Sequence, residues 1–191
     1  MPSTHCAESR RLGRNTVAAL ALASLALAAA SPAEAACITK AGSATGVTRG
    51  FAERTHSLWW ETVGRLLDSL PAISFDFGEG VETLDLSTEA MKLRAFQRFA
   101  HFVATQDEML GIAQIDALAR EHGVDPLQIT ADLVMDGGEL RRTGSHPLAS
   151  LGAHTLSHRA VARLAPEEAR REMRQSAEWV ETLTGERPAS L

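Results

Sequence analysis

The apolar residues change their spacing partway through the first half of the chain. From residue 51 to residue 70 they recur every three or four positions, which predicts one amphipathic helix that ends before Pro71. Residues 72–86 instead hold two short stretches rich in β-branched and aromatic residues, separated by Gly78 and Gly80. This pattern predicts a small β-hairpin after the helix.

Helical spacing returns after the hairpin and predicts a run of further helices. They are expected over residues 87–104 and 107–121, from residue 125 onward, and around residues 138–142. Ser87 is the expected N-cap of the first of them, and Gly123 is expected to end the second. Pro126 suits the first turn of the third, where its missing N–H leaves no hydrogen bond unmade.

The last quarter of the chain begins with a short apolar segment, residues 148–153, which predicts a buried strand. Two histidines, His154 and His158, follow this strand directly. Pro166 and the acidic residues after it then open a strongly amphipathic helix, and Gly185 is its expected C-cap.

The N-terminus has the layout of a secretory signal, with a basic start, an apolar run and a small-residue cleavage site. The basic residues are Arg10, Arg11 and Arg14, the apolar run covers Val17 to Ala30, and the small residues surround Ala35. Export to the periplasm or the medium is therefore expected, by a general or a twin-arginine-like signal. An Ala-rich helix or a mistaken start codon is the alternative, and the protein would then be cytoplasmic.

Composition narrows the classes of partner. The chain has 191 residues, enough for one domain, and a net charge of −5 with its Lys and Arg scattered. This argues against nucleic acid or an anionic membrane as the main partner. The apolar run of the leader is too short to span a bilayer comfortably, so no stable membrane span is expected. A monomer is expected as well. Cys6 and Cys37 make neither a disulfide framework nor a zinc-ribbon spacing.

The two histidines are the strongest chemical signal. Spaced four residues apart, His154 and His158 can face the same way on one helical turn, or converge in a tight loop. Neutral imidazoles are good ligands for Zn²⁺ and similar divalent ions. A catalytic zinc usually has three protein ligands, so this pair predicts part of a metal site.

The residues around the pair resemble the second motif of the polysaccharide deacetylases of the NodB-homology family. The matching segments are Leu151-Gly152-Ala153-His154-Thr155-Leu156-Ser157-His158, Ala160-Val161-Ala162-Arg163-Leu164 and Glu167-Glu168-Ala169-Arg170-Arg171-Glu172. The resemblance implies a deformed (β/α) barrel, of the α/β class, that removes acetyl groups from glycans with a divalent metal, most often zinc. It implies that His154 and His158 bind the metal and that Thr155 shapes their loop.

The resemblance also suggests how the chain is divided. Residues 1–36 would be the leader, 37–50 a linker, 51–144 a mostly helical insertion, and 145–191 a partial deacetylase domain. Gly50-Phe51-Ala52 and Leu58-Trp59-Trp60-Glu61 are similar to the segment that leads into such an insertion in some bacterial members. This chain itself is expected to be helix-rich with few short strands.

The family's first motif, Thr-Phe-Asp-Asp-Gly, has only a weak counterpart here. In Ser74-Phe75-Asp76-Phe77-Gly78, Asp76 would align with the catalytic base, but Phe77 replaces the metal-binding aspartate. The fragment also lies in the wrong order along the chain, so a turn aspartate is the alternative interpretation. The family's later motifs would follow Pro188 and are absent. We therefore expect an incomplete copy with little deacetylase activity alone.

Two other functions stay open. A non-catalytic remnant could bind glycan, with Trp59 and Trp60 stacking on sugar rings, although such a pair more often belongs to a core. Residues 117–130 also resemble a helix-turn-helix DNA-binding module. Their second helix carries Asp132 and no Lys or Arg, whereas a recognition helix is expected to be basic.

Overall fold

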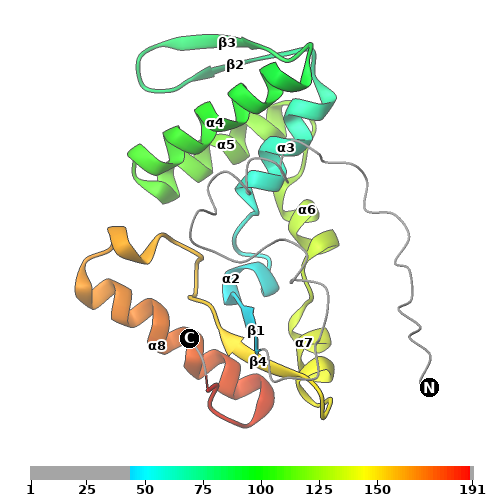
Figure 1. Cartoon of the computed structure of the whole chain (residues 1–191), viewed down its shortest axis with the longest axis vertical. Coiled ribbons are helices and arrows are strands. Elements are labelled where there is room, and N and C mark those ends of the chain that lie inside the picture. The colour runs from blue at the N-terminus through cyan, green and yellow to red at the C-terminus, as the bar shows by residue number, and fades with distance from the viewer. Residues whose placement is uncertain (1–43, 190–191) are drawn as a thin grey trace, which may run out of the picture.

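Helices dominate the computed structural model, which describes residues 44–189 and is helix-rich with few short strands (Figure 1). One end of the molecule is formed by three helices and a hairpin. They are α3 (Trp59–Ser69), β2 (Ala72–Asp76), β3 (Val81–Asp85), α4 (Glu89–Thr105) and α5 (Glu108–Glu121). The other end contains β1 (Ala44–Val47), α2 (Arg49–Ala52), α7 (Gly137–Gly144), β4 (Ser150–Ala153), the 3-10 turn η2 (Val161–Arg163) and α8 (Pro166–Thr184). The helix α6 (Pro126–Leu133) connects the two.

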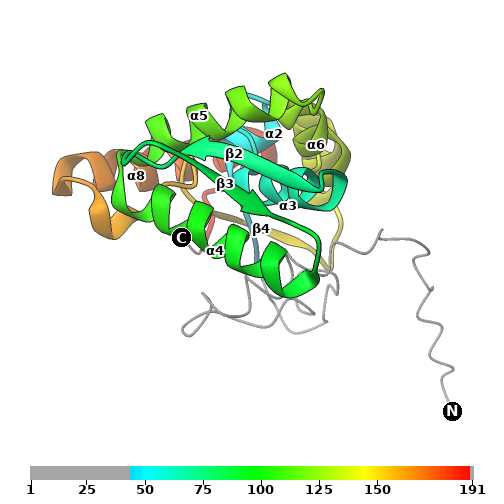
Figure 2. The ribbon, with the colours of Figure 1, turned by 90° about the horizontal axis from the view of Figure 1, so that it is seen from above.

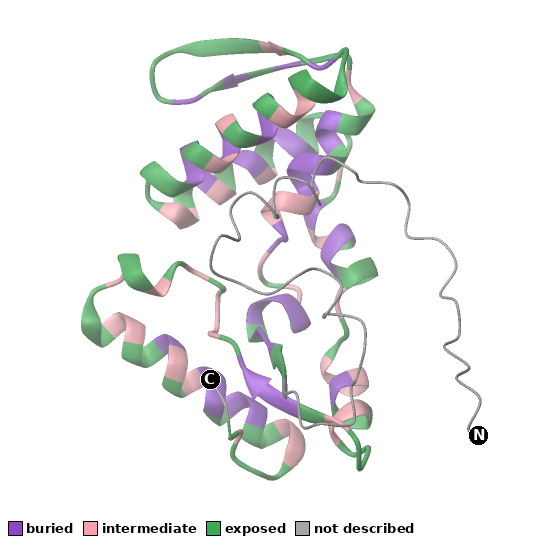
Figure 3. Ribbon diagram, in the orientation of Figure 1, coloured by how far each residue is buried: buried purple, intermediate pink, exposed green. Residues whose placement is uncertain are grey.

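The first core lies where α3, α4 and α5 face one another, and their buried faces are turned inward in Figure 3. Leu66, Leu67, Phe96, Phe99 and Ile115 are fully buried there. The three- and four-residue spacing of these side chains places them on one face of each helix, so the sequence pattern and the packing agree.

The predicted hairpin of residues 72–86 is confirmed as the antiparallel pair β2–β3, which lies across α4 and α5 (Figure 2). Phe75 and Phe77 point from it into the first core, with ring centroids 5.2 and 5.0 Å from that of Phe99. Burial of these aromatic rings stabilises a two-stranded sheet that would be marginal in isolation.

Asp and Thr side chains cap the N-termini of α4, α5, α6 and α7. Asp107, Asp125 and Asp136 accept hydrogen bonds from the first-turn amides of α5, α6 and α7, and all three helices were predicted. The N-cap of α4 is Thr88, whose hydroxyl accepts a bond from the Met91 amide, so the prediction of Ser87 was wrong by one residue.

The predicted single helix over residues 51–70 is divided into α2 and α3. Arg54 interrupts it with a left-handed backbone, at φ 59°. Its guanidinium donates to the carbonyls of Phe51 and Val134, at 2.6 Å each. The bond to Val134, at the end of α6, joins residues far apart in the sequence, which helical spacing cannot reveal.

The second core joins segments from both ends of the described chain. Val47 and Leu140 pack with Leu151, Ala177 and Val180. The predicted linker over residues 37–50 was therefore wrong from residue 44 onward, because β1 pairs in parallel with β4, with Val47 opposite Ala153. A four-residue strand in a Gly-rich segment has too weak a local signal, and its pairing with a segment about a hundred residues away fixes it.

The described residues form two separate two-stranded sheets and no closed barrel, so the predicted barrel relationship stays a prediction. Within residues 44–189 no helix combines the length and the apolar character needed to cross a bilayer. The predicted leader, residues 1–36, lies outside the described residues.

We predict that Phe99→Ala lowers the free energy of unfolding by about 3–5 kcal/mol, because it leaves a cavity at the centre of the first core. Urea unfolding followed by circular dichroism measures the change. Val81→Ala is the control, since Val81 is 74% exposed and its truncation is expected to cost less than about 0.5 kcal/mol. Equal effects of the two substitutions would contradict the described core.

Candidate functional site

The segment that carries the two histidines directly follows β4, which pairs in parallel with β1. The His154 amide donates to the Val47 carbonyl at 3.1 Å, and the His154 carbonyl accepts from the Thr48 hydroxyl at 2.7 Å. Gly46 lies against the His154 side chain, and a Cβ there would come within 3.1 Å of the His154 Cβ. A glycine in β1 therefore leaves room for the first histidine.

A tight loop, and not a helical turn, brings the two histidines together. Thr155 and His158 both have left-handed backbones, at φ 61° and 59°. The Thr155 hydroxyl accepts a hydrogen bond from the His158 amide at 3.0 Å and so closes the loop. The ring centroids of His154 and His158 are 5.2 Å apart.

Glu172 of α8 holds this loop in place with hydrogen bonds. Its carboxylate accepts hydrogen bonds from the amides of Leu156 and Ser157, at 2.9 and 3.0 Å, and from the Ser157 hydroxyl at 2.8 Å. Glu172 is only 8% exposed. A buried carboxylate needs such donors, because burying a charge without hydrogen bonds is costly.

The imidazole of His158 contacts two aromatic rings on its other side. Its centroid lies 5.2 Å from those of both Phe51 and Trp60. Desolvation by these neighbours, followed by the charge of the nearby His154, lowers the pKa of His158 to about 4. The ring is therefore neutral at neutral pH, which is the form that binds a metal.

The two rings fit two positions of a divalent metal site, since both are imidazoles and they lie on one loop. No group of three or more His, Cys, Asp or Glu with a geometry suited to a metal occurs within residues 44–189. Asp76, the weak candidate for the base, is the last residue of β2, and its carboxylate accepts hydrogen bonds from the amides of Gly78 and Gly80 in the hairpin turn. The structure thus joins His154, Thr155 and His158 in one loop and places Asp76 in the separate β2–β3 sheet.

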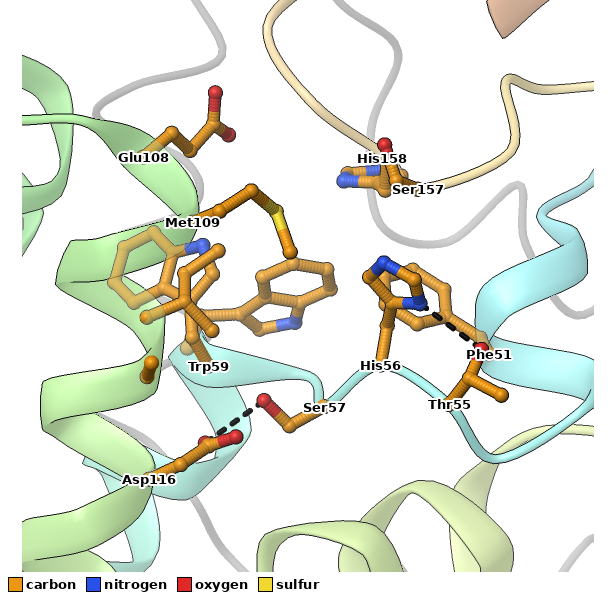
Figure 4. Close-up of a pocket in the computed structure, with 13 residues that line it drawn as sticks. Phe51, Thr55, His56, Ser57, Trp59, Glu108, Met109, Asp116, Ser157 and His158 are labelled. Atoms are coloured by element: carbon orange, nitrogen blue, oxygen red, sulfur yellow. Dashed lines mark hydrogen bonds between the residues drawn. The ribbon is translucent and has the colours of Figure 1, made fainter.

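A pocket of about 190 Å³ opens beside His158, between its loop and the helical end of the molecule (Figure 4). Phe51, Trp59 and Trp60 supply aromatic walls. The side of the pocket formed by α5 carries two carboxylates, Glu108 and Asp116, with Met109 between them in the view of Figure 4.

The polar groups of the pocket are held by defined partners. Asp116 accepts from the Ser57 hydroxyl at 2.8 Å, and burial raises the pKa of this carboxyl above its ordinary value. Glu108 accepts from the Ala160 amide at 3.0 Å. Opposite them, His56 contacts the Thr55 hydroxyl at 3.0 Å, and desolvation lowers the pKa of its imidazole despite the charge of Glu172.

Several of these residues were not singled out from the sequence. Glu172 carried a signal, because an acidic residue at this position falls on the same face of α8 as the buried Ser176, Trp179 and Val180. Asp116 and His56 carried none, since the segments that hold them meet only in the folded chain.

Comparisons of the chain with protein-family models, curated proteins and solved structures give no match. The resemblance to the polysaccharide deacetylases therefore stays a prediction, and the site is interpreted from its own geometry.

We predict that Glu172→Gln lowers the free energy of unfolding by about 1–3 kcal/mol, because the amide cannot replace a charged acceptor of three hydrogen bonds. Chemical denaturation measures the change. Glu178→Gln on the exposed side of the same helix is the matched control, with an expected change below about 0.5 kcal/mol. A Glu172→Gln protein as stable as this control would contradict the role of the carboxylate.

We also predict that His158 titrates with a pKa of about 4 in the folded, metal-free protein. Because the unfolded value is about 6.5, the neutral ring favours the folded state above that pH, and this contribution falls as the pH drops toward 4. Histidine ring resonances in NMR, assigned with His158→Gln, follow the titration. A midpoint near 6.5 in the folded protein would contradict the desolvation of this ring beside Phe51 and Trp60.

Proposed function

We propose that this chain supplies the two-histidine half of a metal centre that hydrolyses acetyl groups on a glycan, with little activity alone. One observation carries the proposal: a loop at the C-terminal end of β4 brings His154 and His158 together. The family resemblance of the same residues, quoted above, supplies the reaction class and zinc as the expected metal.

In this proposal the residues of the chain have separate tasks. His154 and His158 would hold the metal, whose chemistry when bound is to polarise an acetyl carbonyl and to activate a water. Glu172 and Thr155 keep the loop in the geometry that places the two ring centroids 5.2 Å apart. No catalytic base is assigned, since Asp76 is engaged in the hairpin turn.

A non-catalytic glycan-binding protein is the second candidate, and the aromatic pocket beside His158 favours it. Trp59 and Trp60 are half-buried against the first core, so they serve that core and the pocket at the same time. DNA binding by α5 and α6 has less support, because α6 carries Asp132 and no basic residue.

We predict that the purified protein binds one Zn²⁺ and that His154→Ala weakens this binding at least tenfold, about the smallest effect expected when one of two imidazole ligands is lost. Competition with a chromogenic chelator measures the affinity. His101→Ala is the matched control, because His101 is an exposed histidine on α4, and its zinc affinity should equal that of the unchanged protein.

Acetate release from N-acetylated chitooligosaccharides tests the reaction class in the same preparations. The rate should be low even with saturating zinc, and whatever rate occurs should disappear with a chelator and in His154→Ala. Zinc binding that is unchanged in His154→Ala would overturn the metal half-site. Acetate release that survives the chelator would overturn the metal-dependent reaction.

A further inference from the structure

The pocket beside His158 is lined by segments that lie far apart along the sequence. Its carboxylates come from α5, its aromatic walls from α2 and α3, and Ser157 and His158 from the loop after β4 (Figure 4). His154 does not line it. The pocket therefore lies next to the histidine pair and not over it.

We propose that this pocket binds one neutral N-acetylated pyranose ring, the sugar unit next to the one presented to the histidine pair. Glu108 and Asp116 would accept hydrogen bonds from the ring and set its specificity. The glycan identity of the ligand rests on the proposed function, whereas the pocket and its polar groups do not.

The combination of walls and acceptors suits a pyranose. Sugar rings have apolar C–H faces that pack on aromatic side chains, and Trp59 and Trp60 offer such surfaces at the pocket. The volume of about 190 Å³ is below the 300–1,000 Å³ of pockets that enclose larger ligands, so it holds about one ring.

The two carboxylates define the length of the ligand. Glu108 and Asp116 are two helical turns apart on α5, so their Cα atoms are separated by about 12 Å along the helix axis. With both side chains turned into the pocket, a ligand that reaches both needs hydrogen-bond donors at opposite ends of a small ring. The hydroxyl and amide groups of an N-acetylhexosamine are arranged in this way, and Met109, Ile112 and Ala113 of α5 add apolar surface to the same pocket.

The charges around the pocket favour a neutral ligand over a cationic one. Arg163 lies 3.9 Å from Glu108, and Arg120 lies 4.0 Å from Asp116, so each carboxylate already faces a guanidinium. A free amine would gain little from carboxylates that are already compensated.

The test uses the three tryptophan indole resonances of the full chain, observed by NMR in chelator during titration with N-acetylglucosamine. The signals of Trp59 and Trp60 should shift and saturate with a Kd on the order of 1 mM, and that of Trp179 in the second core should not move. Glucosamine, which is cationic, should bind at least about fivefold more weakly.

Asp116→Asn should weaken binding about tenfold, the effect of losing one charged acceptor. Glu121→Gln, at the end of the same helix and outside the pocket, should leave it unchanged. If Asp116→Asn fails to fold, Ala113→Leu is the second variant. Ala113 is exposed in the empty pocket, so a larger side chain there should block sugar binding.

Failure of this proposal is separable from failure of the metal site. His154→Ala should lose zinc and still bind the sugar, because His154 does not line the pocket. No saturable shift of the Trp59 and Trp60 signals would overturn the sugar site while leaving the zinc result standing. The proposal would also be overturned if Glu121→Gln weakened sugar binding as much as Asp116→Asn does. Tighter binding of glucosamine than of N-acetylglucosamine would overturn it as well.

Discussion

The carboxylate of Glu172 accepts hydrogen bonds from two backbone amides and one hydroxyl of the loop that carries the histidines. This loop contains two residues with left-handed backbones, Thr155 and His158. This conformation costs free energy for any residue other than glycine. The Glu172 carboxylate offsets that cost, because its three hydrogen bonds to the loop form only in this conformation. The position of both imidazoles therefore depends on an interaction between the last helix and the segment after β4.

A second set of contacts connects the C-terminal part of the same segment to the helices α4 and α5. Arg163 donates to the carbonyls of Val103 and Gln106 at the C-terminus of α4. Glu108, at the start of α5, accepts from the Ala160 amide. The loop is thus held by α8 on one side and by α4 and α5 on the other, and the pocket forms between the loop and α5.

Both the strands and the helices of this fold contribute to the candidate site. His154 and His158 follow the C-terminal end of β4, and the C-terminal ends of strands are where α/β folds usually locate their chemistry. The aromatic and acidic walls beside them come from α3 and α5. In the proposed function, the strands would contribute the metal ligands and the helices the surface that selects the glycan.

Local patterns predicted much of this fold. Helical spacing, capping residues and the proline at residue 166 located most helices within a few residues, and the β-like stretches separated by Gly78 and Gly80 located the β2–β3 hairpin. The pairing of β1 with β4 and the interruption at Arg54 were missed, because both depend on contacts with residues far away along the chain. The same holds for the site: the His154–His158 spacing was visible, whereas Asp116 and His56 join it only through tertiary packing.

X-ray absorption at the zinc edge of the zinc-loaded protein tests the central claim most directly, because it reports the atoms that surround the metal. The account predicts two imidazole nitrogens at about 2.0–2.1 Å with the remaining positions filled by oxygen, and the loss of one imidazole in His154→Ala. A zinc environment without imidazole scattering, or one that is the same in His154→Ala, would contradict it.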